Sequence, residues 1–328
     1  MIKAKRILSL TLCAIVLISS FLCLSSCANT ALTVSNEDGS FKVSYDLLRY
    51  FAMNYINGYE GVSAEDFASN EELQKKLSDN VFASVCDLAT YKILAEKYGV
   101  SLSRQEKKEV KNTLKEYKKS YESKDAFKKD LEANYITEKV LEEIYMLQAL
   151  FDKLYTHMTN EYTGIFRYDN DVIDADIEAG NFFSAEYIVI YYTDDNKEER
   201  LSELSKMLDE AKGGKSMSVM RDEKYSEYAE QIVYNKEDIF TYTEMNETYE
   251  NAVTSIEIGA FSDIIDMENA AMIVHRLPLS EEYIDKNYND VIAKYLSREF
   301  FKYIEEYSEN LVPEFKDKYK DLKLWEME

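Results

Sequence analysis

The feature that most constrains the fold of this chain is a change in the spacing of its hydrophobic residues. Apolar side chains recur three and four positions apart from Val140 to Leu154 and again from Ile292 to Leu311, which predicts long amphipathic helices. Between them, residues 185–192 and 270–277 are mostly apolar runs of strand length, rich in aliphatic and aromatic side chains. The pattern predicts an α+β chain. Its mostly helical domain is built from both ends of the sequence, and a small α/β domain is inserted between them.

Capping signals refine this outline. Ser44 precedes an apolar-periodic segment that ends near Gly58, Ser103–Glu106 has the spacing of a capping box, and Thr137 begins the strongest helix. The final helix has an apolar stripe of its own, so we expect it to return to the first helical region. The expected segments are a signal peptide at 1–26, a polar tether at 27–40, a helical domain at 41–175, the inserted domain at 176–280 and the returning C-terminal helix at 281–328.

The N-terminal segment has the layout of a secretory signal. Three basic residues precede an uncharged apolar run from Ile7 to Leu24, and small residues then lead to Cys27. This ending resembles the bacterial lipobox, which implies that Cys27 is lipidated and becomes the new N-terminus. A plain transmembrane anchor is the alternative, although a run of about 18 residues lies at the lower limit for a span. We expect an extracytoplasmic protein held by its lipid to the outer face of the bacterial cell membrane.

The charge and the cysteines narrow the class of protein further. The chain has 62 acidic and 39 basic side chains, a formal charge of −23, and loss of residues 1–26 removes three cations and no anion, giving −26. Such a body is repelled by phosphate backbones, which argues against a nucleic-acid partner. Cys13 and Cys23 lie in the signal and Cys27 is the lipidation site, so Cys86 alone remains and no internal disulfide is expected. A core position suits Cys86 better than a half-exposed one.

Familiar catalytic motifs are missing from the sequence. Its two histidines, His157 and His275, belong to no Cys/His cluster of metal-ligand spacing. There is no Gly-rich phosphate loop, and no Gly-x-Ser-x-Gly nucleophile elbow occurs. The sequence therefore predicts neither a metal nor a cofactor, and a hydrolase is disfavoured.

Residues along the chain do resemble a known family. Residues 95–103, a Lys/Glu-rich helix, Ala126-Phe127 and residues 135–141 together resemble the N-terminal domain of PrsA-type foldases and SurA-type chaperones. Residues 36–44 resemble the hairpin that begins that domain. Residues 185–190 and 272–274 resemble the first and last strands of a parvulin domain, and Tyr249–Ala252, with Met245 upstream, resembles the stretch before the last strand.

The departures from the parvulin pattern affect the residues on which isomerase activity is expected to depend. Tyr187 and Met272 stand where the family has its two strand histidines, and Thr254 stands where it has a pocket phenylalanine. No glycine occurs between residues 215 and 258, where the family has a Gly-rich segment. The resemblance implies that Met245, Tyr249 and Thr254 occupy substrate-binding positions; ordinary core packing is the alternative for Met245 and Tyr249. We therefore expect a degenerate isomerase domain.

Three functions are compatible with these observations. The first is a lipid-anchored chaperone or foldase for unfolded, newly secreted polypeptides, with a weak or inactive isomerase domain. The second is an active peptidyl-prolyl cis-trans isomerase, and the third is a scaffold lipoprotein with one partner in the envelope. A homodimer through the helical halves is compatible with the sequence.

Overall fold

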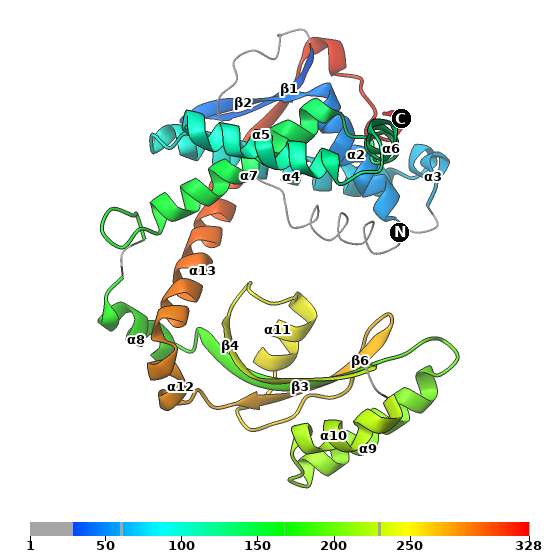
Figure 1. Cartoon of the computed structure of the whole chain (residues 1–328), viewed down its shortest axis with the longest axis vertical. Coiled ribbons are helices and arrows are strands. Elements are labelled where there is room, and N and C mark those ends of the chain that lie inside the picture. Colours follow the sequence, from blue (N-terminus) through cyan, green and yellow to red (C-terminus); the bar gives the residue numbers. More distant parts are fainter. Residues whose placement is uncertain (1–28, 60–61, 167, 229–230, 328) are drawn as a thin grey trace. The chain divides into compact units, whose positions relative to one another are not determined.

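The computed structural model describes residues 29–59, 62–166, 168–228 and 231–327. The chain divides into two compact units: the first holds the described residues up to Ile165 together with those from Phe300 onward, and the second is Phe166–Glu299 (Figure 1). Helices and two small antiparallel sheets make up these units, so the α+β class is confirmed. The expected signal segment and Cys27 lie outside the described residues. Within the described ranges, no helix is both long and apolar enough to cross a bilayer.

The first unit is mainly helical, and its helices begin where the capping signals placed them. Ser44 accepts a hydrogen bond from the Leu47 amide, Thr137 accepts one from the Val140 amide, and both hydrogen bonds of the Ser103–Glu106 capping box are present. Its complete helices are α2 (Tyr45–Gly58), α3 (Ala64–Ser69), α4 (Glu71–Lys97), α5 (Arg104–Lys119), α6 (Lys124–Ala133) and α7 (Glu138–Met158).

A three-stranded antiparallel sheet joins the two ends of the chain in this unit. Strands β1 (Thr30–Asn36), β2 (Gly39–Ser44) and β7 (Val312–Phe315) lie in the order β2-β1-β7. The expectation of a polar tether over residues 27–40 is therefore wrong for its described part. Ala31, Leu32 and Val34 are fully buried, and their burial holds this segment in the sheet. Polar residues between them in the sequence make the segment look like a tether.

The C-terminal segment packs against the first unit from Phe300 onward. The Phe300 ring lies 5.5 Å from the Phe151 ring and 5.0 Å from the Tyr155 ring, measured between centroids. Farther along, the Tyr98 and Tyr303 hydroxyls lie 3.1 Å apart, within hydrogen-bonding distance. These aromatic contacts follow from the apolar stripe that the sequence shows in this helix.

The boundaries between the units differ from those expected at 175/176 and 280/281. They fall after Ile165 and after Glu299, the latter inside α13 (Tyr288–Ser308). The reason is a separate apolar cluster in the second unit, in which Ile173 and Val291 pack with Phe182 and Ile239 of the strands. This cluster ties α8 (Asn170–Glu178), α12 (Glu281–Lys286) and the first turns of α13 to the sheet-bearing unit.

The second unit is a four-stranded antiparallel sheet covered unequally on its two faces. Its strands are β3 (Phe182–Tyr191), β4 (Ile232–Thr241), β5 (Ile265–Asp266) and β6 (Ala270–Leu277), in the order β4-β3-β6-β5. The helices α9 (Lys197–Lys212) and α10 (Met217–Tyr228) pack on one face, whereas α11 (Glu247–Thr254) packs on the other (Figure 1). We call the second of these the α11 face.

A half-buried acidic residue in the first unit, Asp87, predicts an unusual pH dependence. Burial and the nearby Glu305 carboxylate raise the pKa of Asp87 from 3.8 to about 6. Between these two values the folded chain binds more protons than the unfolded chain, so this group's contribution to stability falls as the pH rises through that window. The neighbouring Cys86 thiol is half-buried, and burial followed by the Asp87 charge raises its pKa to about 11.

We predict that Asp87→Asn stabilises the first unit by about 1–3 kcal/mol at pH 7.5 and by much less at pH 4.5, because the variant carries no buried charge at either pH. The single tryptophan of the chain, Trp325, lies in this unit, so its fluorescence during denaturant unfolding reports the change. A gap between variant and parent that is equal at both pH values would contradict the assignment.

Candidate functional site

The candidate site is a cavity of about 350 Å³ on the α11 face of the second unit. Its floor comes from alternate residues of β3 and from their antiparallel partners on β6. Val189 pairs with Met272 and Tyr191 with Ala270, and paired residues share one face of a sheet. The cavity is lined by Tyr187, Val189, Tyr191, Met245, Asn246, Tyr249, Met267, Glu268, Asn269, Ala270 and Met272; we call it the groove.

The turn between β4 and α11 positions one wall of the groove. The Asn246 side chain caps α11 by accepting a hydrogen bond from the Tyr249 amide at 3.0 Å. Thr243 adopts a positive φ of 66°, which is costly for a β-branched residue, and its amide donates to Glu250 at 2.7 Å. These local bonds hold Met245 at the rim of the groove.

A second turn positions the opposite wall. The Tyr192 hydroxyl donates to the Asp266 carboxylate and lies within hydrogen-bonding distance of the Met267 carbonyl. The Met267 amide donates to the Ala270 carbonyl at 2.8 Å, closing the turn between β5 and β6. Met267 and the two residues that follow it are thereby presented to the groove.

The structure brings together four of the five residues singled out from the sequence. Tyr187 and Met272 stand on adjacent strands and line the groove with Met245 and Tyr249. The Tyr187 and Tyr249 rings meet edge to face at 5.1 Å, and Tyr249 is only 3% exposed, so Tyr249 belongs both to the core and to the groove wall. Thr254 is not a lining residue, because it ends α11 and its hydroxyl donates to the Glu250 carbonyl at 2.8 Å.

Sequence reasoning missed several groove residues. Val189 and Tyr191 follow Tyr187 at the two-residue period of a strand, so that period could have identified them. Met267 lies in a turn that carries no comparable signal. Tyr191 is 48% exposed within the groove. Val233, the β4 partner of Val189, does not line the groove and is 41% exposed, so apolar surface continues beyond it.

The lining offers a largely apolar surface for binding. Its members are mostly aromatic, methionine or aliphatic, and the eleven include no histidine, lysine or arginine. Transfer of about 100 Å² of apolar surface from water into such a groove is worth about 2.5 kcal/mol. Methionine side chains adapt to different shapes, and tyrosine offers rigid amphipathic area. The arrangement can therefore hold varied apolar side chains.

The strand histidine lies in a different cluster. His275 Nδ1 and the Glu186 carboxylate are 2.9 Å apart, and the Tyr234 hydroxyl donates to the same carboxylate at 2.7 Å. The Phe261 ring stacks on His275 at 4.1 Å. The hydrogen bond with His275, and then that from Tyr234, lowers the pKa of Glu186 against the opposing effect of burial. Tyr234 and Phe261 pack against the core beneath α9 and α10, so this cluster belongs to the face opposite the groove.

The other histidine and the acidic residues form no metal centre that the structure describes. His157 lies in the last turn of α7, where its ring is 6.4 Å from the Tyr98 ring. Across the described parts of the chain, no group of three or more His, Cys, Asp or Glu side chains is placed to hold an ion.

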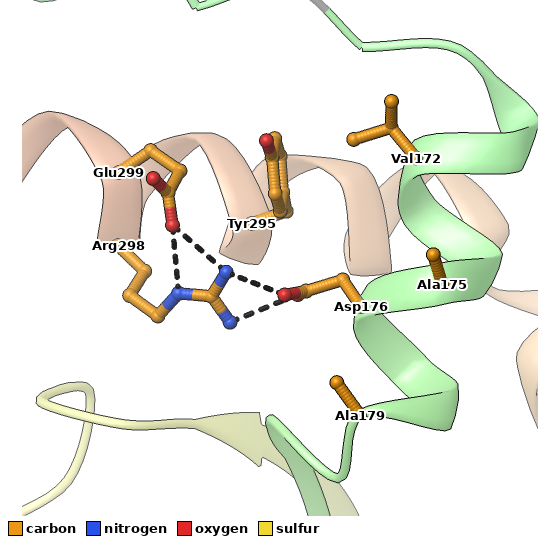
Figure 2. A pocket seen from close by; sticks show the side chains of 7 residues that line it. All are labelled: Val172, Ala175, Asp176, Ala179, Tyr295, Arg298 and Glu299. Atoms are coloured by element: carbon orange, nitrogen blue, oxygen red, sulfur yellow. Dashed lines mark hydrogen bonds and ion pairs between the residues drawn. The ribbon is translucent and has the colours of Figure 1, made fainter.

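A second cavity, of about 400 Å³, is built around an ion pair. Figure 2 shows Arg298 between Asp176 of α8 and Glu299 of α13, with the Tyr295 ring beside them. Two guanidinium nitrogens lie 2.9 Å from the two Asp176 oxygens, and Arg298 also donates to the Thr241 hydroxyl at 3.0 Å. Burial alone would lower the pKa of Arg298, but the bonds to Asp176 and Glu299 outweigh burial and raise it. Because Arg298 contacts Asp176 of α8, Glu299 of α13 and Thr241 of β4, we assign the cluster a structural role, joining these three elements.

We predict that Arg298→Met destabilises the second unit by about 2 kcal/mol, because it leaves Asp176 without its main partner beside a cavity that water can enter. Hydrogen–deuterium exchange of peptides covering α8 and β4 should accelerate accordingly. Arg221→Met, at a pair with the exposed Asp222, is the matched control and should leave exchange unchanged. Equal protection in parent and Arg298→Met would show that the pair contributes nothing.

Comparison with known proteins found similar solved structures. The foldase protein PrsA from Streptococcus pneumoniae is 20% identical, with a TM-score of 0.31 over 71% of this chain and 80% of that chain. PrsA from Lactococcus lactis is 16% identical, with a TM-score of 0.35 over 88% and 95%. A structure from the SurA-like chaperones PEB4 and Cj1289 of Campylobacter jejuni is 11% identical, with a TM-score of 0.28 over 88% and 99%. No protein-family model and no curated protein matches the sequence.

Proposed function

We propose that this protein is an extracytoplasmic chaperone of the foldase type, which holds apolar segments of unfolded, newly secreted polypeptides in the groove. The observation that carries the proposal is the groove's lining of tyrosine and methionine on the α11 face. Such a lining offers apolar area without fixed shape, which is what a binder of many different segments requires.

The same lining argues for little or no isomerase activity. Rotation about an X-Pro bond faces a barrier of the order of the peptide value, about 18–20 kcal/mol. Lowering it requires groups that stabilise the twisted amide more than the planar one. Tyr187 and Met272 occupy the positions at which the resemblance implies histidines, and Thr254 points its hydroxyl into its own helix. We therefore propose a domain that retains binding and has lost most of its catalysis.

Anchoring is the second part of the proposal. Lipidation of Cys27 would hold the body at the outer face of the cell membrane, where secreted chains emerge unfolded. A single acyl chain binds a membrane weakly, so stable anchoring requires more than one. Intact mass measurement of the mature protein tests this part: a diacyl adduct on Cys27 that Cys27→Ser abolishes is expected, and an unmodified mature N-terminus would overturn it.

The holding function is tested by light scattering from a denatured client diluted into buffer. The mature chain carrying Cys27→Ser should suppress aggregation at stoichiometric amounts. Tyr191→Asp should weaken suppression about tenfold or more, because a carboxylate on the rim must be desolvated when an apolar segment binds. Tyr225→Asp is the matched control, since Tyr225 is equally exposed, at 48%, but lies on α10 across the sheet.

Two results would contradict the holding function. One is a parent protein that does not suppress aggregation at stoichiometric amounts. The other is equal suppression by Tyr191→Asp and Tyr225→Asp, which would place the client elsewhere on the molecule.

For catalysis, we predict that a protease-coupled proline-peptide assay gives the same rate with and without the protein. Acceleration that Tyr187→Phe or Met245→Ala lowers would instead establish an active isomerase and would assign the groove to it. Tyr225→Phe is the control for that series.

A further inference from the structure

The second unit carries most of the negative charge of the chain. Residues 166–299 contain 31 Asp and Glu against 13 Lys and Arg, a formal charge of −18 out of −23 for the whole sequence. A field of this size raises the local concentration of cations and repels anions over distances of about 8–10 Å at physiological salt. The unit that bears the groove therefore attracts cationic segments and repels anionic ones before any direct contact forms.

The groove itself is also negatively charged. Glu268 is its one charged lining residue, and it is exposed in the turn between β5 and β6. Glu247 directly follows the lining residue Asn246 and is also exposed. Because none of the eleven lining residues is basic, nothing on the groove wall offsets these carboxylates.

Unlike these two, the neighbouring carboxylates take part in ion pairs or hydrogen bonds. Glu244 pairs with Lys294, Asp266 pairs with Lys197 at 2.8 Å, and Glu250 accepts the Thr243 amide. Among the described residues, Glu268 and Glu247 have no ion-pair partner. Glu247 complements the N-terminus of α11, whereas Glu268 lies in a turn where no helix end explains its charge.

From this arrangement we infer that the groove selects segments in which an aromatic or aliphatic side chain is flanked by lysine or arginine. The apolar side chain enters among the methionines and tyrosines, and the flanking cation meets the Glu268 carboxylate at the rim. The inference rests on the proposed function, since it names the class of client that the groove accepts. A single exposed pair contributes about two- to threefold in affinity, and the field of the unit adds a larger, salt-sensitive part.

The test is fluorescence anisotropy with three labelled peptides that share one apolar core and carry Lys, Gln or Glu flanks. Binding to the mature Cys27→Ser chain should follow the order Lys, Gln, Glu, with about a tenfold or greater gap between the extremes at 50 mM salt. The gap should narrow strongly at 500 mM salt, where the Debye length is a few ångströms. Glu268→Gln should weaken the Lys-flanked peptide about two- to threefold and leave the Gln-flanked peptide unchanged.

Asp209→Asn is the matched control, because it removes one exposed carboxylate from α9 across the sheet. Equal affinity for all three peptides, a preference for Glu flanks, or an equal loss from Asp209→Asn and Glu268→Gln would overturn the charge selectivity while leaving the holding function intact. Failure of all three peptides to bind would instead overturn the holding function.

Discussion

The groove exists because one helix is too short for the strand that it covers. The eight residues of α11 span about 12 Å, whereas the ten residues of β3 span about 33 Å. The opposite face is packed by the sixteen residues of α9 and the twelve of α10, and its core is closed. On the α11 face the apolar side chains of β3 continue past the helix, so Tyr191 and its neighbours meet solvent. This exposed apolar surface is the basis on which we propose a binding site there.

In the proposed account, apolar burial and charge make different contributions to client recognition. Apolar contact in the groove favours any segment that can exclude water, because the hydrophobic effect is non-directional. In the proposed account, the negative field of the second unit favours cationic segments over anionic ones. The Glu268 carboxylate at the rim provides a direct contact for the cation. The polar clusters around Arg298 and His275 are held together by ion pairs and hydrogen bonds within the second unit.

Much of the architecture could be predicted from the sequence, because period, caps and turns act over a few residues. The long helices and the strands β3 and β6 follow from such local patterns, whereas the family resemblance alone singles out Tyr187 and Met272. What failed depends on distant contacts. Strand β7 has a proline and four residues, and only its pairing with β1 makes it a strand. Likewise, Met267 lines the groove from a turn that is hydrogen-bonded to Tyr192, which directly follows β3 and lies 75 positions earlier in the chain, so no local spacing encodes that contact.

The methionines permit the most direct measurement of where a client binds. Met245, Met267 and Met272 lie at the groove, whereas Met207 of α9 and Met217 and Met220 of α10 are buried in the core on the other face of the sheet. With ¹³C-labelled methionine methyl groups, addition of an apolar peptide should shift the first three signals and leave the second three in place. Shifts confined to the second set, or none at the groove while the peptide binds, would contradict the assignment of the α11 face as the client site.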